Sequence, residues 1–283
     1  MELIFSAALC SVLVSMLLKF TKQKGFDALQ MIAWNYAIAS LLSYLWFKPD
    51  LVHISISNTP WWLIVGLGVV LPSIFFCLSK SLQSAGILRT EIAQRLSVVL
   101  SLLAAYFLFQ EQFNQLKIVG IGLGIFAVLC IVLSHSDASN QSINKKGMLY
   151  LLSVWGGYAL VDILLKYTTS LGLQFPVTLT LMFICSFVLS IGYLVLQKTQ
   201  WKIQNLCAGL VLGVLNFANI ALYVKAHLLL KDSPAVVFAG MNILVVLMGV
   251  MAGLVIFKEK LKVVTALGLV LGLLGVIFLA LAI

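Results

Sequence analysis

Charged side chains are scarce in this sequence: 10% of its 283 residues are Asp, Glu, Lys or Arg, whereas 62% are hydrophobic. A chain so poor in charge cannot cover its apolar side chains with a polar surface in water. This composition excludes an ordinary water-soluble fold and indicates an integral membrane protein. The net charge of +9 does not indicate nucleic-acid binding, because the Lys residues cluster near the ends of apolar segments, as is usual beside a membrane.

Residues that build catalytic and metal sites are also few. The three histidines, His53, His135 and His227, lie on different segments, and no paired carboxylates or nucleophile–base motif accompany them. The five cysteines fall inside apolar segments without CxxC or Cys/His spacing. A glycine-rich phosphate loop followed by Lys and Ser or Thr is missing as well. We therefore expect no enzyme activity, no cofactor and no metal site.

Apolar segments long enough to cross a bilayer recur ten times. A helix needs about 20 apolar residues to span the hydrocarbon core, and a strand of about half that length would alternate in polarity. The sequence predicts an all-α membrane protein with ten transmembrane helices. The expected spans are 3–20, 28–47, 61–82, 86–109, 114–134, 147–168, 175–197, 205–229, 233–257 and 261–282.

The second half of the chain repeats the first. Residues 13–21 and 160–168 are identical at six of nine positions, at a shift of 147. Further pairs are Gly25 and Gly172, and, at a shift of 148, Phe109, Glu111, Gly120 and Gly124 with Phe257, Glu259, Gly268 and Gly272. We expect a first five-helix repeat at 1–134, a polar linker at 135–146 and a second repeat at 147–283. Because each half crosses the membrane five times, the repeats must be inverted, which is common in secondary transporters.

Polar residues that differ between the two halves are the candidates for a substrate site. In the sixth span, Trp155, Tyr158 and Asp162 share one helical face. An acidic residue inside a membrane span is costly unless it faces a cavity or a partner, so Asp162 is a candidate functional residue. The alternative is that Asp162 pairs with Lys166, one turn further on, and only stabilises the helix.

The eighth span carries a polar stripe of Asn216, Asn219, Tyr223 and His227 on one face. We favour an interpretation in which this stripe lines a cavity. Hydrogen bonds between helices would also explain the two asparagines.

The fourth span opens with Glu91 and Arg95, which lie one turn apart and form either a gate network or a structural ion pair. Gln94 and Asn242 occupy equivalent positions in the two halves, which suits polar contacts to a substrate near the pseudo-two-fold axis. Trp34 and Asn35 of the second span complete the set of candidate substrate-binding residues.

Two further features have alternative interpretations. Lys19, Lys80, Lys166 and Lys225 form symmetric pairs, and we expect their side chains to reach the membrane interface rather than to form a basic cavity. Pro72 in the third span is expected to bend or break that helix.

The motifs around the fourth and ninth spans identify a family resemblance. Phe109-Gln110-Glu111 and Phe257-Lys258-Glu259 follow these spans, and Ser233-Pro234-Ala235-Val236 opens the ninth. The chain resembles the EamA-type ten-helix branch of the drug/metabolite transporter superfamily. Charge counts in the loops place both termini outside, whereas members of the family typically keep both termini in the cytoplasm.

The resemblance implies a secondary-active transporter of small metabolites, such as amino acids or amines, in a bacterial inner (plasma) membrane. Alternating access about a central cavity is expected, with Asp162 or Glu91 as the proton-coupling group, because burial favours the protonated form of a carboxyl group. The alternatives are an organic-anion carrier that uses the paired lysines and a flippase for lipid-linked substrates. The sequence leaves open whether the protein is a monomer or a homodimer.

Overall fold

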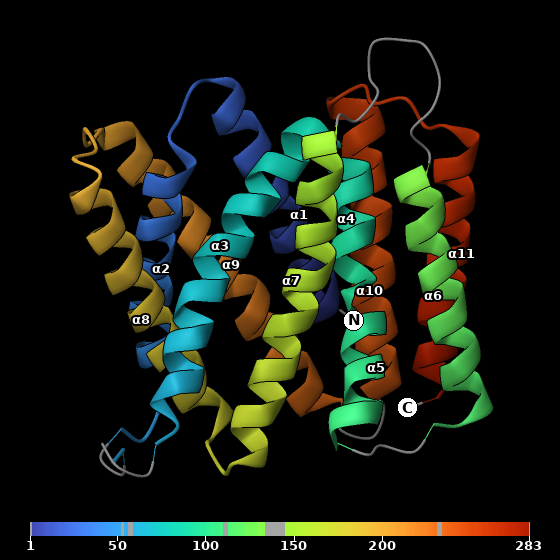
Figure 1. Cartoon of the computed structure of the whole chain (residues 1–283), viewed down its shortest axis with the longest axis horizontal. Helices are drawn as coiled ribbons and strands as arrows, with labels where there is room; N and C mark the ends of the chain where they lie inside the picture. The colour runs from blue at the N-terminus through green and yellow to red at the C-terminus, as the bar shows by residue number, and fades with distance from the viewer. Residues whose placement is uncertain are drawn as a thin grey trace.

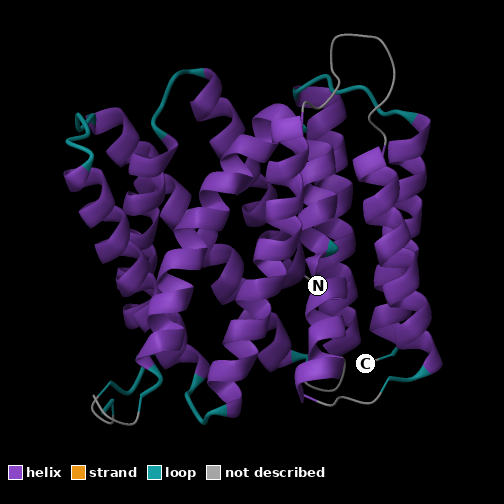
Figure 2. Ribbon diagram, viewed as in Figure 1, coloured by secondary structure: helices purple, strands orange, loops and turns teal. Residues whose placement is uncertain are grey.

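The computed structural model describes residues 2–282, apart from 52–53, 56–58, 110–112, 134–144 and 231–233. Its regular elements within these ranges are helices (Figure 2), as the composition predicts. Most of the expected polar linker at 135–146 lies outside the described residues, so the domain boundary stays a prediction.

The first half contains six helical elements, and the second half contains six more. They are α1 (Glu2–Gln23), α2 (Ala28–Phe47), α3 (Trp61–Ser84), α4 (Ile87–Arg95), α5 (Ser97–Phe109) and α6 (Gln115–Leu133), followed by α7 (Lys145–Ser170), α8 (Phe175–Leu196), α9 (Ile203–Leu229), α10 (Pro234–Met251), the π-helix η1 (Ala252–Ile256) and α11 (Val263–Leu281). α4 continues into α5, and α10 continues into η1, so the twelve elements make ten spans (Figure 1).

The lengths and surfaces of these spans suit a bilayer. Eight of the described helical segments are long and apolar enough to cross a membrane, and α6 contains a shorter apolar helix. Large apolar side chains lie on the outside of the bundle, where Phe107, Leu196 and Val263 are 74%, 84% and 86% exposed. Hydrocarbon rather than water is the solvent in which such a surface is stable.

The helices of one half pack against those of the other in a symmetric pattern. α1 packs against α9 and α10, and its counterpart α7 packs against α3 and against α4 and α5. α2 packs against α9 as α8 packs against α3, while α2–α8 and α6–α11 pair directly across the two halves. If each helix is replaced by its counterpart in the other half, every one of these helix pairs becomes another pair of the same set. This is expected of an inverted repeat. The two halves therefore interlock rather than form separate bodies (Figure 1).

Glycines mark the same symmetry in atomic detail. Gly213 of α9 lies against Ile38 of α2, and Gly68 of α3 lies against Cys185 of α8, so the two contacts join equivalent residues of the repeat. Small residues at these points let helix backbones approach closely within the chain.

Replacing Gly213 by Ala is expected to destabilise the fold by about 1–3 kcal/mol, because an added methyl group overpacks a rigid contact. Its Cβ atom would lie 1.9 Å from Ile38 Cγ2 and 2.7 Å from the backbone oxygen of Asn35. Thermal unfolding in detergent micelles measures the effect. Gly192→Ala in α8 is the matched control, since a Cβ atom there has no neighbour within 4 Å. Equal melting temperatures for the two variants would contradict the close approach of α2 and α9.

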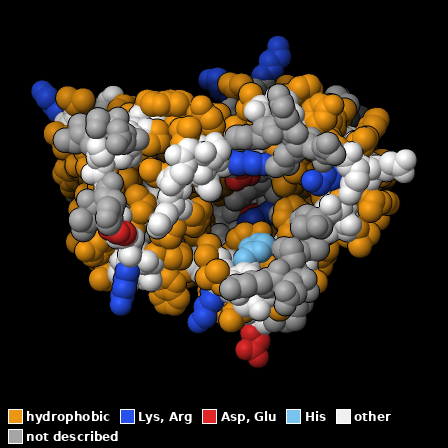
Figure 3. Space-filling view, turned by 90° about the horizontal axis from the view of Figure 1, so that it is seen from below, with side chains coloured by type: hydrophobic (Ala, Val, Ile, Leu, Met, Phe, Trp, Pro, Cys, Tyr) orange, Lys and Arg blue, Asp and Glu red, His pale blue; other side chains and the backbone are white. Residues whose placement is uncertain are grey.

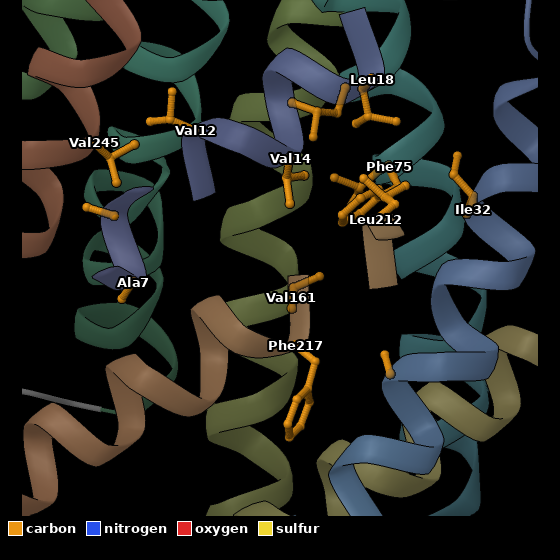
Figure 4. Close-up of a cluster of buried hydrophobic side chains, with 14 of the residues drawn as sticks. Ala7, Val12, Val14, Leu18, Ile32, Phe75, Val161, Leu212, Phe217 and Val245 are labelled. Atoms are coloured by element: carbon orange, nitrogen blue, oxygen red, sulfur yellow. The ribbon is translucent and has the colours of Figure 1, made fainter. Parts of the chain in front are cut away.

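The apolar core also joins the halves. One buried cluster includes Val12 and Val14 of α1, Phe75 of α3, and Leu212 and Phe217 of α9 (Figure 4). A second cluster fills the space around α4, α5, α6 and α11. Each cluster contains residues from both halves, so neither repeat has a core of its own.

Candidate functional site

A cavity of about 550 Å³ lies among α4, α5, α7, α8, α9 and α10. A hollow in the face seen from below contains a histidine and, deeper, basic and acidic side chains (Figure 3). Eight residues proposed from the sequence line this cavity: Gln94, Arg95, Tyr158, Asp162, Asn219, Tyr223, His227 and Asn242. The structure thus brings together polar residues from four different spans.

Other candidates from the sequence lie outside the cavity lining. Asn216 donates a hydrogen bond to Asn35 Oδ1 at 3.1 Å, which is the interhelical alternative considered for the asparagines. Trp34 packs against the rings of Trp201 and Phe187, with centroids 6.2 and 6.3 Å away. These residues hold α2, α8 and α9 together beside the site.

The fourth span is broken at Leu96, next to the cavity. α4 ends at Arg95 and α5 begins at Ser97, and the indole Nε1 of Trp155 donates a hydrogen bond to the Leu96 carbonyl at 3.0 Å. Trp155 therefore satisfies a backbone group at the break rather than lining the cavity. Of the two alternatives for Pro72, the break is not observed, since α3 runs through it from Trp61 to Ser84, and the bend stays a prediction. Discontinuous helices are a common feature of substrate sites in transporters.

Opposite charges face the same cavity. Asp162 accepts a hydrogen bond from the Ser101 hydroxyl at 3.3 Å, a partner on α5. Arg95 donates from Nη2 to Ser11 Oγ, and its Nε–H has no hydrogen-bond partner among the described residues. Lys166, the alternative partner of Asp162, does not line the cavity. The site can therefore offer a negative carboxylate and a positive guanidinium group to one bound molecule.

Glu91 does not form the hydrogen-bonded ion pair with Arg95 that their spacing suggested. Its side chain is 1% exposed, and neither carboxyl oxygen has a hydrogen-bond partner within the described parts of the chain. The stem of Glu91 packs against Gly249 of α10. Glu91 thus lies buried behind the cavity rather than in its lining.

A charged cluster lies at the opposite end of the bundle, beside a second cavity of about 550 Å³ that it helps to line. Glu259, in the connection between η1 and α11, pairs with Lys19 and accepts hydrogen bonds from the backbone N–H groups of Ile87 at 2.7 Å and Leu88 at 3.2 Å. Lys19 Nζ also lies 4.3 Å from the centroid of the Phe257 ring. We call Lys19, Glu259 and the first turn of α4 the latch. The latch ties α1 and α4 to the connection that leads into α11.

Lys19 has a partner within the bundle. Its side chain is buried and bound to Glu259, and the expectation that it reaches the membrane interface stays a prediction. An ion pair of this kind compensates a buried ammonium group that would otherwise be unstable.

Several residues of the site were not found from the sequence. Ser101 and Ser11 bind the two charged residues, and Phe175 and Phe238 add aromatic rings to the cavity lining. Serine and phenylalanine are common in apolar spans, so their types alone gave no indication. Glu259 could have been found, because it recurs as Glu111 in a chain that has few acids.

Inverted halves that interlock around a polar cavity are typical of membrane transporters. A family model described as the EamA-like transporter family matches residues 2–133, which cover the first five spans up to the end of α6. A Haemophilus influenzae protein, described as an uncharacterized protein, is 40% identical over 279 residues, covering 96% of this chain and 94% of the relative. The chain belongs to the EamA-like transporter family and is an integral membrane protein.

Proposed function

We propose that the protein is a secondary-active carrier that moves small zwitterions or amines, such as amino acids, by alternating access. The observation that carries this proposal is the pairing of an open polar cavity with a latch at the opposite end. A channel would need a continuous path, whereas a carrier closes one end while the other is open. Inverted repeats provide two such states of similar energy, because each half can adopt the conformation of the other.

The chemistry of the cavity supports this class of substrate. The Asp162 carboxylate would bind an ammonium group, and the Arg95 guanidinium would bind a carboxylate in a bidentate manner. Tyr158 and Tyr223 add aromatic rings, which attract both cations and apolar side chains. A volume of about 550 Å³ lies within the usual range of small-molecule sites.

The organic-anion alternative relied on the paired lysines. Lys19 is neutralised by Glu259 and lines the second cavity, at the opposite end of the bundle, rather than this one. An anion without an ammonium group would in addition meet the negative charge of Asp162. The cavity therefore favours a zwitterion or an amine over an anion.

Uptake by proteoliposomes tests the proposal with three molecules of one shape. L-Phenylalanine carries both charges, phenethylamine only the ammonium and 3-phenylpropanoate only the carboxylate. We expect saturable uptake of phenylalanine, weaker uptake of phenethylamine and the weakest uptake of 3-phenylpropanoate. A preference for 3-phenylpropanoate would support the organic-anion carrier instead. The same assay is then extended to a panel of other amino acids and amines. The proposal is contradicted if none of these compounds, including the three probes, enters faster than it enters protein-free liposomes.

A further inference from the structure

We propose that Glu91 is the proton-binding site of this carrier and that Arg95 couples its protonation to substrate binding. The inference rests on the proposed function and identifies the coupling residue within it. It assigns different roles to the two acids of the site, with Asp162 binding the substrate and Glu91 binding the proton.

The surroundings of Glu91 favour a neutral carboxyl group in the observed conformation. Ser15 of α1 and Arg95 of its own helix are the polar groups beside it, and Tyr158 of α7 lies near both charged side chains. α10 contributes Gly249, which has no side chain to offer. An ionised carboxylate that is buried without a hydrogen bond is strongly unfavourable, whereas the protonated acid is not.

A line of polar groups on α1 runs from the cavity to the latch. Ser11, Ser15 and Lys19 lie at successive spacings of four and therefore on one face. Ser11 binds Arg95, Ser15 lies beside Glu91, and Lys19 binds Glu259 at the start of α4. Glu91 thus lies buried between the cavity and the end of the bundle that carries the latch.

The repeat places the two acids on opposite sides of the pseudo-two-fold axis. At a shift of 147, Asp162 is the counterpart of Ser15, the residue beside Glu91. In the observed state Asp162 faces the cavity and Glu91 is buried behind it. When the halves exchange conformations, the stretch that contains Glu91 opens and the stretch that contains Asp162 closes. Glu91 is then exposed to the side of the latch, where it releases its proton.

Arg95 couples proton binding to substrate binding, because the substrate carboxylate and the Glu91 carboxylate compete for its guanidinium group. In the observed state Arg95 binds Ser11 and faces the cavity, so Glu91 has no counter-ion and holds one proton, taken up from water, as a carboxylic acid. After the halves have exchanged conformations and the substrate carboxylate has left Arg95, Arg95 pairs with Glu91, which returns that proton to water. Arg95 stays protonated throughout, so one proton and one zwitterion bind together and travel in the same direction. The coupling is therefore symport.

Transport of L-phenylalanine by proteoliposomes tests this coupling. At zero membrane potential, one proton per zwitterion allows a pH gradient of one unit to drive up to about tenfold accumulation on the alkaline side. Glu91→Gln resembles the protonated acid, so we expect exchange of phenylalanine to persist and accumulation driven by the pH gradient to disappear. Glu2→Gln is the matched control, because Glu2 is an exposed acid in the first turn of α1. Persistent accumulation by Glu91→Gln, or accumulation of phenylalanine on the acidic side by the wild type, would overturn the inference.

A measurement without substrate separates this inference from the proposed function. Infrared spectra of the full chain in lipid at neutral pH should contain the carbonyl band of a protonated carboxylic acid. The band should be absent from Glu91→Gln and retained by Asp162→Asn. Its presence in Glu91→Gln at wild-type intensity would refute the assignment, even if phenylalanine proved to be a substrate. The band could also be lost in Glu91→Gln while the wild type transports none of the probes. That result would support Glu91 as the proton site and contradict the carrier proposal.

Discussion

Replacing Asp162 by Asn is expected to reduce phenylalanine uptake at least about thirtyfold. The substrate ammonium group loses its counter-ion in a desolvated cavity, and losses of this kind cost about 2–5 kcal/mol. Phenethylamine uptake should fall by a similar factor, because its ammonium group is its only charge. Initial rates in proteoliposomes, measured over a range of substrate concentrations, give the change in kcat/KM.

The matched control for this variant is Asp27→Asn. Asp27 caps α2 by accepting a hydrogen bond from the Leu29 N–H at 2.9 Å, and Asn caps a helix equally well. Both variants remove one carboxylate, but only Asp162 lines the cavity. Uptake by Asp162→Asn equal to that of Asp27→Asn would show that Asp162 does not contact the substrate.

Replacing Glu259 by Gln is expected to release the latch and open that end of the bundle further. The change removes the charge that neutralises Lys19, whose side chain is 9% exposed, and weakens the cap on α4. A shift of about 1.4 kcal/mol between the two states changes their ratio tenfold, and loss of one partner of a buried ion pair costs more than this. In a cysteine-free background, Ser15→Cys is expected to react at least about tenfold faster with an impermeant maleimide added from the latch side.

Lys260→Gln is the control for the latch. Lys260 lies in the same connection, next to Glu259, but is exposed and outside the ion pair. It should leave the reactivity of Ser15→Cys unchanged. If Glu259→Gln also left it unchanged, the Lys19–Glu259 pair would be a structural contact rather than part of a gate.

Membrane physics made the spans predictable from the sequence. The helix expected at 28–47 is α2 to the residue, and the other spans differ by a few residues at their ends. Lipid leaves a chain of this composition few alternatives to apolar helices of about 20 residues. The contacts of Gly213 with Ile38 and of Gly68 with Cys185 were not predicted from the sequence, since contact partners depend on the tertiary packing.

The parts of the site that escaped prediction depend on contacts between distant residues. The break at Leu96 follows no Pro or Gly, and its carbonyl is satisfied by Trp155, 59 positions further along the chain. The one-turn spacing of Glu91 and Arg95 suggested a local pair, but Ser11 on another helix binds Arg95 instead. Helical spacing shows which side chains share a face, and it does not show which partner a flexible side chain selects.

Counterflow of labelled L-phenylalanine tests the central claim most directly. Proteoliposomes loaded with unlabelled phenylalanine are diluted into a trace of labelled phenylalanine, without a gradient of pH or voltage. A carrier with alternating access exchanges one molecule for another, so the label should accumulate transiently inside and the process should saturate. Equilibration of the label without transient accumulation, at a rate that does not saturate, would show a continuous pathway and contradict the account.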